Sequence, residues 1–118
     1  MIYELRTYEM VPELFEEYLE RADNVLLPII MEDIGFRIVG FWRADSESDG
    51  PLAPGEEEQM SKIPAQVVWM IAWESKEERT QKWTELAANE DWQRELKLKY
   101  YAGAHVKFIQ PTNASPLQ

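Results

Sequence analysis

The clearest hydrophobic pattern in the chain is the run from Ala65 to Glu74, which is apolar almost without interruption and rich in Val, Ile and Trp. Such a run is typical of a central strand with both faces covered. Ser75 follows directly and can cap a new helix through its hydroxyl, while Glu78 can reach back to complete a capping box. The pattern therefore predicts a strand that ends at Glu74 and a helix that begins after Ser75.

Three other segments have the alternation of strands, over residues 2–8, 36–43 and 105–110. In the first, Tyr3, Leu5 and Thr7 form one face, which we expect to meet helices. The opposite, more polar face contains Glu4, Arg6 and Tyr8.

Helical periodicity fills the intervals between these strands. From Pro12 onward, apolar residues recur at steps of three and four, which predicts a helix with a kink at Pro28 and a left-handed cap at Gly35. A second helix is predicted over residues 76–88, and a third is capped by Asn89 and ended by Gly103.

The order of these elements is that of a ferredoxin-like βαββαβ sandwich, an α+β fold with a four-stranded antiparallel sheet. Both helices of that fold cover the same side of the sheet, so the other side is expected to be bare and to display Trp69, Ile71 and Trp73. An apolar patch of this extent marks an interface. We therefore expect a homodimer in which two sheets face each other.

Composition narrows the functional classes. The formal net charge is −10, without a local basic patch, which argues against nucleic-acid binding. The chain has no cysteine, which fits a reducing cytoplasm, and we expect neither a signal peptide nor a membrane span. Residues 44–64 form a Pro- and Gly-rich loop with six acidic residues and one lysine, which carries half of the net charge. Residues 1–111 are expected to form one domain and residues 112–118 a tail.

Several stretches together resemble the NIPSNAP family of the dimeric α+β barrel superfamily. They are YELRTYEM near the start, IGFRIVGFW, AWESKEERTQKW, NEDW and QPTNASPL near the end, so the resemblance covers nearly the whole chain. It implies a ferredoxin-like protomer that pairs sheet to sheet, with a cavity between the sheet and the partner or at the barrel mouths. Relatives commonly have a Pro-Gly-Lys turn where this chain has Val11-Pro12-Glu13, and the acidic loop is longer than expected. The family has no settled activity to carry over.

Candidate chemistry must therefore come from the residues themselves. The predicted strands place a polar and aromatic cluster on the face away from the helices, made of Glu4, Arg6, Tyr8, Trp69, Trp73, His105 and Lys107. Arg6 can form a bidentate contact with a carboxylate, or it can pair with Glu4. His105 can transfer a proton near neutrality or serve as a hydrogen-bonded wall residue. Trp69 and Trp73 can line a ligand site or form the core of the dimer interface.

Two functional hypotheses follow. In the first, the protein binds a small hydrophobic or anionic molecule in a barrel cavity, as a binding protein or as a cofactor-independent monooxygenase or isomerase. Arg6 anchors the anion there, Tyr8 and His105 orient it or move a proton, Trp73 walls the cavity, and Glu4, Trp69 and Lys107 contribute contacts. In the alternative, the protein is a non-catalytic dimeric interaction module that acts through its acidic loop. One histidine and no cysteine predict no zinc-type metal site, and we expect no haem or other cofactor.

Overall fold

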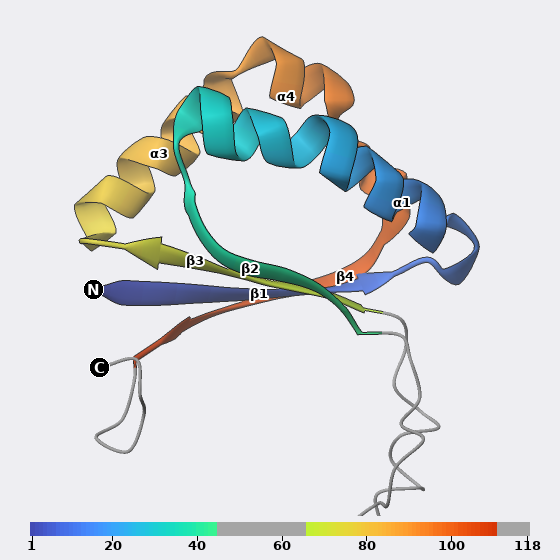
Figure 1. The fold of residues 1–118 in the computed structure, drawn as a ribbon, viewed down its shortest axis with the longest axis horizontal. Helices are drawn as coiled ribbons and strands as arrows, with labels where there is room; N and C mark the ends of the chain where they lie inside the picture. Colours follow the sequence, from blue (N-terminus) through green and yellow to red (C-terminus); the bar gives the residue numbers. More distant parts are fainter. Residues whose placement is uncertain (45–65, 111–118) are drawn as a thin grey trace, which may run out of the picture.

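The structure is a computed structural model that describes residues 1–44 and 66–110. The elements, in chain order, are β1 (Ile2–Met10), the 3₁₀ turn η1 (Pro12–Leu14), α1 (Phe15–Arg21), the π-helical segments η2 (Ala22–Leu26) and η3 (Ile29–Ile34), β2 (Arg37–Ala44), β3 (Gln66–Trp73), α3 (Lys76–Ala88), α4 (Glu90–Glu95), the 3₁₀ turn η4 (Leu98–Tyr100) and β4 (Tyr101–Ile109). The strands form one antiparallel sheet in the order β2-β3-β1-β4. Its helices all lie on one side (Figure 1), so the predicted ferredoxin-like α+β fold is confirmed. The predicted acidic loop and tail lie largely outside the described residues.

The helical stretch between β1 and β2 ends as the sequence predicts. Gly35 has a φ of 93° and donates its N–H to the carbonyl of Ile30, so the left-handed cap is confirmed. Pro28 has no N–H to donate, and hydrogen bonding of the longer π type lies on both sides of it. Leu27, for example, donates to the carbonyl of Ala22. The proline is thus accommodated by a change of helical spacing.

Caps also fix the starts of the two following helices. The Oγ of Ser75 accepts the N–H of Glu78 at 3.1 Å, and the Oδ1 of Asn89 accepts the N–H of Trp92 at 2.9 Å, so both caps are confirmed. The capping box is not closed, however, because the carboxylate of Glu78 accepts a hydrogen bond from Arg37 at 2.6 Å. That contact ties α3 to the edge strand β2.

The third helix and the last strand depart from the prediction. The helix α4 ends at Glu95, and β4 already begins at Tyr101, so that Gly103 lies inside a strand and does not stop a helix. The reason is tertiary, since β1 extends to Met10 and its end pairs with the start of β4, with Glu9 opposite Gly103. Pairing with a long neighbour overrides the helical spacing of residues 92–100.

An irregularity in β2 breaks its simple alternation. The register against β3 shifts between Ile38 and Gly40, so that Ile38 and Phe41 both pack against the core. On the opposite face the indole of Trp42 lies over Gly40, and a Cβ at position 40 would meet it at 2.1 Å. Only glycine fits there without displacing the indole.

The assignment of the two sheet faces was wrong. The face with Val67, Trp69, Ile71 and Trp73 lies under the helices and is almost completely buried within the chain. Strand pairing puts Glu4, Arg6 and Tyr8 on that same face, whereas Tyr3, Leu5 and Thr7 lie on the bare one with Val68 and Met70. Polar residues can be buried here because they satisfy one another, as described below. Trp69 and Trp73 are therefore core residues of one chain, not interface residues of a dimer.

No helix among the described residues is long and apolar enough to cross a membrane.

A candidate ligand-binding cavity

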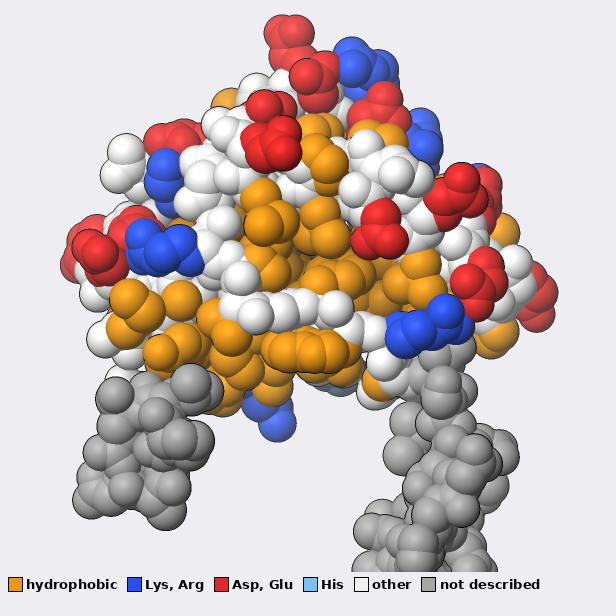
Figure 2. Space-filling model, viewed as in Figure 1, with side chains coloured by type: hydrophobic (Ala, Val, Ile, Leu, Met, Phe, Trp, Pro, Cys, Tyr) orange, Lys and Arg blue, Asp and Glu red, His pale blue; other side chains and the backbone are white. Residues whose placement is uncertain are grey.

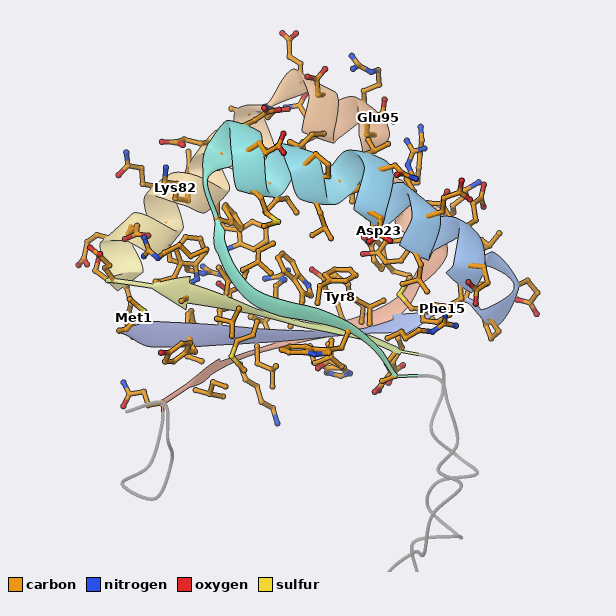
Figure 3. All side chains as sticks on the ribbon, in the orientation of Figure 1. Met1, Tyr8, Phe15, Asp23, Lys82 and Glu95 are labelled. Carbon is orange, nitrogen blue, oxygen red and sulfur yellow. The ribbon has the colours of Figure 1, made fainter. Side chains whose placement is uncertain are left out.

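A cavity of about 520 Å³ lies between the sheet and the helices. Its lining crosses all four strands, from Phe41 of β2 through Trp69 of β3 and Arg6 and Tyr8 of β1 to Ala104 of β4. The helical layer, the segment before β4 and the start of β4 complete it with Tyr18, Ala22, Leu26, Leu27, Ile30, Trp83, Trp92, Leu96, Leu98, Tyr101, Ala102 and Gly103. Figure 2 shows hydrophobic side chains gathered between the helices and β2, and Figure 3 shows Tyr8 projecting from the sheet into this space. None of these described lining residues is acidic.

Arg6 is the cationic side chain of the cavity wall. Its Nε donates to the hydroxyl of Tyr8 at 2.7 Å and its Nη1 to the carboxylate of Glu4 at 2.7 Å. The guanidinium carbon lies 4.5 Å from the centroid of the Trp83 ring, within the range of a cation–π contact. Burial alone would lower the pKa of Arg6, but Tyr8 and Glu4 hold that pKa above its ordinary value. Arg6 is therefore a permanent cation in a fixed orientation.

Glu4 is the buried anion that fixes this orientation, and its side chain is 0% exposed. It accepts five hydrogen bonds: from Trp73 Nε1 at 2.9 Å, Trp83 Nε1 at 3.2 Å, Arg79 Nε at 2.9 Å, Arg79 Nη2 at 3.2 Å and Arg6 Nη1 at 2.7 Å. Burial alone would raise the pKa of Glu4, but the hydrogen bonds, led by those from Arg79, outweigh it and hold that pKa below its ordinary value. Glu4 is thus a saturated acceptor, which leaves it unsuited to act as a base.

Three tyrosines surround the other polar part of the cavity. The rings of Tyr8 and Tyr101 meet edge to face with centroids 5.0 Å apart, and the hydroxyls of Tyr101 and Tyr18 are 3.4 Å apart. Burial raises the pKa of Tyr18, and it raises the pKa of Tyr101 to about 12. Both phenols therefore stay protonated near neutrality and add no negative charge to the cavity.

Trp69 contributes an unsatisfied donor. Its side chain lines the cavity and is 3% exposed, and its indole Nε1 is buried with no hydrogen-bond partner among the described residues. Its ring lies beside Tyr8 and Arg6, with centroid distances of 6.3 Å to the Tyr8 ring and 5.9 Å to the Arg6 guanidinium carbon. A buried N–H without an acceptor costs about 1–3 kcal/mol, so its presence calls for an explanation.

The structure separates the predicted site residues into two groups. Glu4, Arg6, Tyr8 and Trp69 come together on the helix side, which is the side opposite to the predicted one. His105 pairs with Thr7 and Lys107 with Leu5, so both lie on the bare face, where with Leu5 and Thr7 they line a separate, smaller pocket of about 250 Å³. A carboxylate oxygen of Glu9 lies 3.8 Å from the Nε2 of His105.

Two corrections follow from this arrangement. A joint site of Arg6 and His105 is ruled out, because adjacent residues of paired strands project to opposite faces and His105 is opposite Thr7, one residue from Arg6. Trp73 does not line the cavity either, since its indole is buried in the core and donates a hydrogen bond to Glu4. This cavity lies within one chain.

The sequence interpretation also missed part of the site. Arg79 and Trp83 both donate to Glu4, and their four-residue spacing places them on the same face of α3. An arginine and an indole N–H on the buried side of a helix were the available signal for an acid on the facing strand. Tyr18 and Tyr101 carried no comparable signal, because tyrosines on amphipathic elements are ordinary core residues.

Comparisons with known proteins agree with this architecture. No family model matches the sequence, and none of the curated proteins shows significant similarity to it. Among solved structures, a NIPSNAP family protein of unknown function from Agrobacterium tumefaciens is 26% identical, with a TM-score of 0.75 over 100% of this chain and 94% of its own. The similarity to the NIPSNAP family is confirmed.

Two further solved structures show only a likeness of fold. A NIPSNAP domain protein from Burkholderia xenovorans is 24% identical, with a TM-score of 0.72 over 98% of this chain and 99% of its own. An antibiotic biosynthesis monooxygenase is 11% identical, with a TM-score of 0.57 over 95% of this chain and 99% of its own. These two structures share the fold of this chain at low sequence identity.

Proposed function

We propose that this protein binds a small, largely hydrophobic molecule in the cavity between its own sheet and helices. The observation that carries the proposal is the cavity itself, about 520 Å³ in volume and lined by aromatic and aliphatic side chains around Arg6 and Tyr8. Ligand sites in proteins are commonly 300–1,000 Å³, mostly apolar, with a few placed polar groups. Transfer of an apolar molecule from water into the cavity would be favourable in free energy, since its surface would contact side chains such as Trp69, Trp92 and Leu26.

The cavity supports binding better than a cofactor-independent monooxygenase or isomerase reaction. A base is required to start such chemistry, and Glu4 is saturated with donors while His105 lies on the other face of the sheet. The distant monooxygenase neighbour is 11% identical, a level at which only the fold carries over. Binding is therefore the function that we put to the test.

We also propose that the protein is a homodimer that pairs through the bare sheet face. This face includes Leu5, Val68 and Met70 at its centre, all half-buried in a single chain, and the largely exposed Trp42 on its edge strand. No helix of the described residues covers them (Figure 1). Isologous pairing would remove this apolar area from water. The alternative of an interaction module concerns the acidic segment 44–64, nearly all of it outside the described residues, and stays a prediction.

A neutral hydrophobic dye tests the binding proposal without relying on charge. Nile red is expected to bind with one site per chain, measured by fluorescence titration. Ala104→Trp places an indole at the cavity wall on β4 and should abolish this binding. Val106→Trp is the matched control, because Val106 follows two residues later on the same strand face but does not line the cavity. Dye binding that is unchanged by Ala104→Trp would contradict the proposal.

A further inference from the structure

Three polar groups that face the cavity have a hydrogen to donate and no acceptor for it among the described residues. Arg6 gives one hydrogen bond from Nε and one from Nη1, and among the described residues its Nη2 has no partner. Tyr8 accepts from Arg6, so its own hydroxyl proton is directed elsewhere, and no described group accepts it. The buried N–H of Trp69 lacks an acceptor as well. These three donors lie on neighbouring strands around one corner of the cavity.

The net charge of the cluster formed by Glu4, Arg6 and Arg79 also favours an anionic ligand. The buried cluster contains one carboxylate, that of Glu4, and two guanidinium groups, those of Arg6 and Arg79. No other carboxylate of the described residues pairs with either arginine. One positive charge is therefore left over beside the cavity, next to the indole rings of Trp69 and Trp83. A single negative charge on a ligand would neutralise the cluster.

The acceptor must have a particular shape. The Nε and Nη2 hydrogens of a guanidinium point in parallel along one edge, and the Nε hydrogen is already directed at the oxygen of Tyr8. An acceptor placed beside Tyr8 can therefore take one hydrogen from Nη2 and one from the Tyr8 hydroxyl. The two oxygens of a carboxylate have the spacing to do so, and one carboxylate supplies one charge.

We infer that the ligand of this cavity is an apolar monocarboxylic acid whose carboxylate is bound by Arg6 Nη2 and the hydroxyl of Tyr8, while its hydrocarbon or aromatic body lies against Trp69, Trp83 and Trp92. Glu4 and Arg79 are positioning residues in this arrangement, because they hold the Arg6 guanidinium in place without reaching the ligand. A doubly charged phosphate ester would exceed the available positive charge, and a neutral ligand would leave that charge unbalanced. This inference rests on the proposed binding function.

Pairs of ligands that differ only in charge test it. We would measure binding of 2-naphthoate and 2-naphthamide, and of decanoate and decanamide, by isothermal titration calorimetry at pH 7. Each acid should bind roughly 10- to 100-fold more tightly than its amide, as expected for a charge-assisted contact. Arg6→Met should remove most of this preference and leave amide binding in place. Arg94→Met is the matched control, since it removes one exposed arginine that pairs with Asp91 and does not itself line the cavity.

A second variant protects the test against misfolding. Tyr8→Phe keeps the ion pair of Arg6 and Glu4, and it should weaken acid binding about 5-fold while leaving amide binding unchanged. Equal affinities for acids and amides in the unmodified protein would overturn the inference but leave the binding function standing. If neither acids, amides nor Nile red bind, the proposed function itself fails.

Discussion

The buried carboxylate of Glu4 gives the sharpest prediction about stability. Replacing it by Gln keeps the size of the side chain but removes the charge and turns one acceptor oxygen into a donor NH₂ group. In one amide orientation the new NH₂ group faces the guanidinium nitrogens of Arg6 and Arg79, and in the other it faces Arg79 together with the indoles of Trp73 and Trp83. Either way, at least two donors lose their acceptor and meet another donor.

The structure sets the size of the effect. Hydrogen bonds to a charged group contribute about 1.5–3 kcal/mol each, and breaking a buried ion pair by removing one partner costs about 3–5 kcal/mol. Because Glu4 is 0% exposed, water cannot replace the lost contacts without entering the core. We therefore expect Glu4→Gln to lower the free energy of unfolding by about 3–5 kcal/mol.

Urea unfolding followed by circular dichroism measures this difference, at one fixed protein concentration so that any dimerisation contributes equally. Glu85→Gln on α3 is the control, because its carboxylate is 44% exposed and lies 3.8 Å from Lys82. That substitution should change the free energy of unfolding by less than about 0.5 kcal/mol. A loss below about 1 kcal/mol for Glu4→Gln would refute the view that Glu4 is the electrostatic centre of the core.

The same residue predicts a pH dependence. The pKa of Glu4 lies below its ordinary value of 4.5 in the folded chain, so the unfolded chain takes up a proton first as the pH falls. Its contribution to stability is complete above pH 4.5 and is lost as the pH falls through the lower, folded pKa. Stability of the unmodified protein should therefore decline more steeply below pH 4.5 than that of Glu4→Gln, and parallel declines would contradict this.

Three further predictions concern other parts of the molecule. Ser75→Ala removes the acceptor of the Glu78 N–H and should cost about 1 kcal/mol in urea unfolding, whereas Ser75→Asn should not; equal losses would speak against the cap. Met70→Glu puts a charge on the bare sheet face and should yield a folded monomer in sedimentation at micromolar concentration, and a surviving dimer would exclude pairing through this face. The pKa of Tyr101 is raised from 10.0 to about 12, so stability should be complete below pH 10 and fall as the pH rises toward 12, and Tyr101→Phe should show a smaller fall in alkaline unfolding. An equal fall in that variant would mean that Tyr101 is not the group responsible.

Local signals in the sequence were sufficient for the order of the elements and for most of their bounds, though not for the end of α4 and the start of β4. The caps at Ser75 and Asn89 and the left-handed turn at Gly35 depend on hydrogen bonds within a few residues, and such bonds follow from residue type. The same holds for the periodicity of α3, which the sequence placed over residues 76–88. The order of elements then allows few topologies, so the ferredoxin-like sheet could be predicted. The NIPSNAP resemblance came instead from particular stretches of residues, such as YELRTYEM and AWESKEERTQKW.

Which face of the sheet is buried was decided only by tertiary contacts. Alternation along β1 separates Glu4, Arg6 and Tyr8 from their neighbours, but it does not say which set meets the helices. Burial of Glu4 depends on Arg79 and Trp83, which lie 75 and 79 residues away in the chain and supply the donors that make a buried carboxylate stable. The cavity has the same origin, because its wall is assembled from all four strands and the helices above them. The sequence contained all of these side chains, and only packing between distant segments determined that Arg6 and Tyr8 would face this cavity and His105 would not.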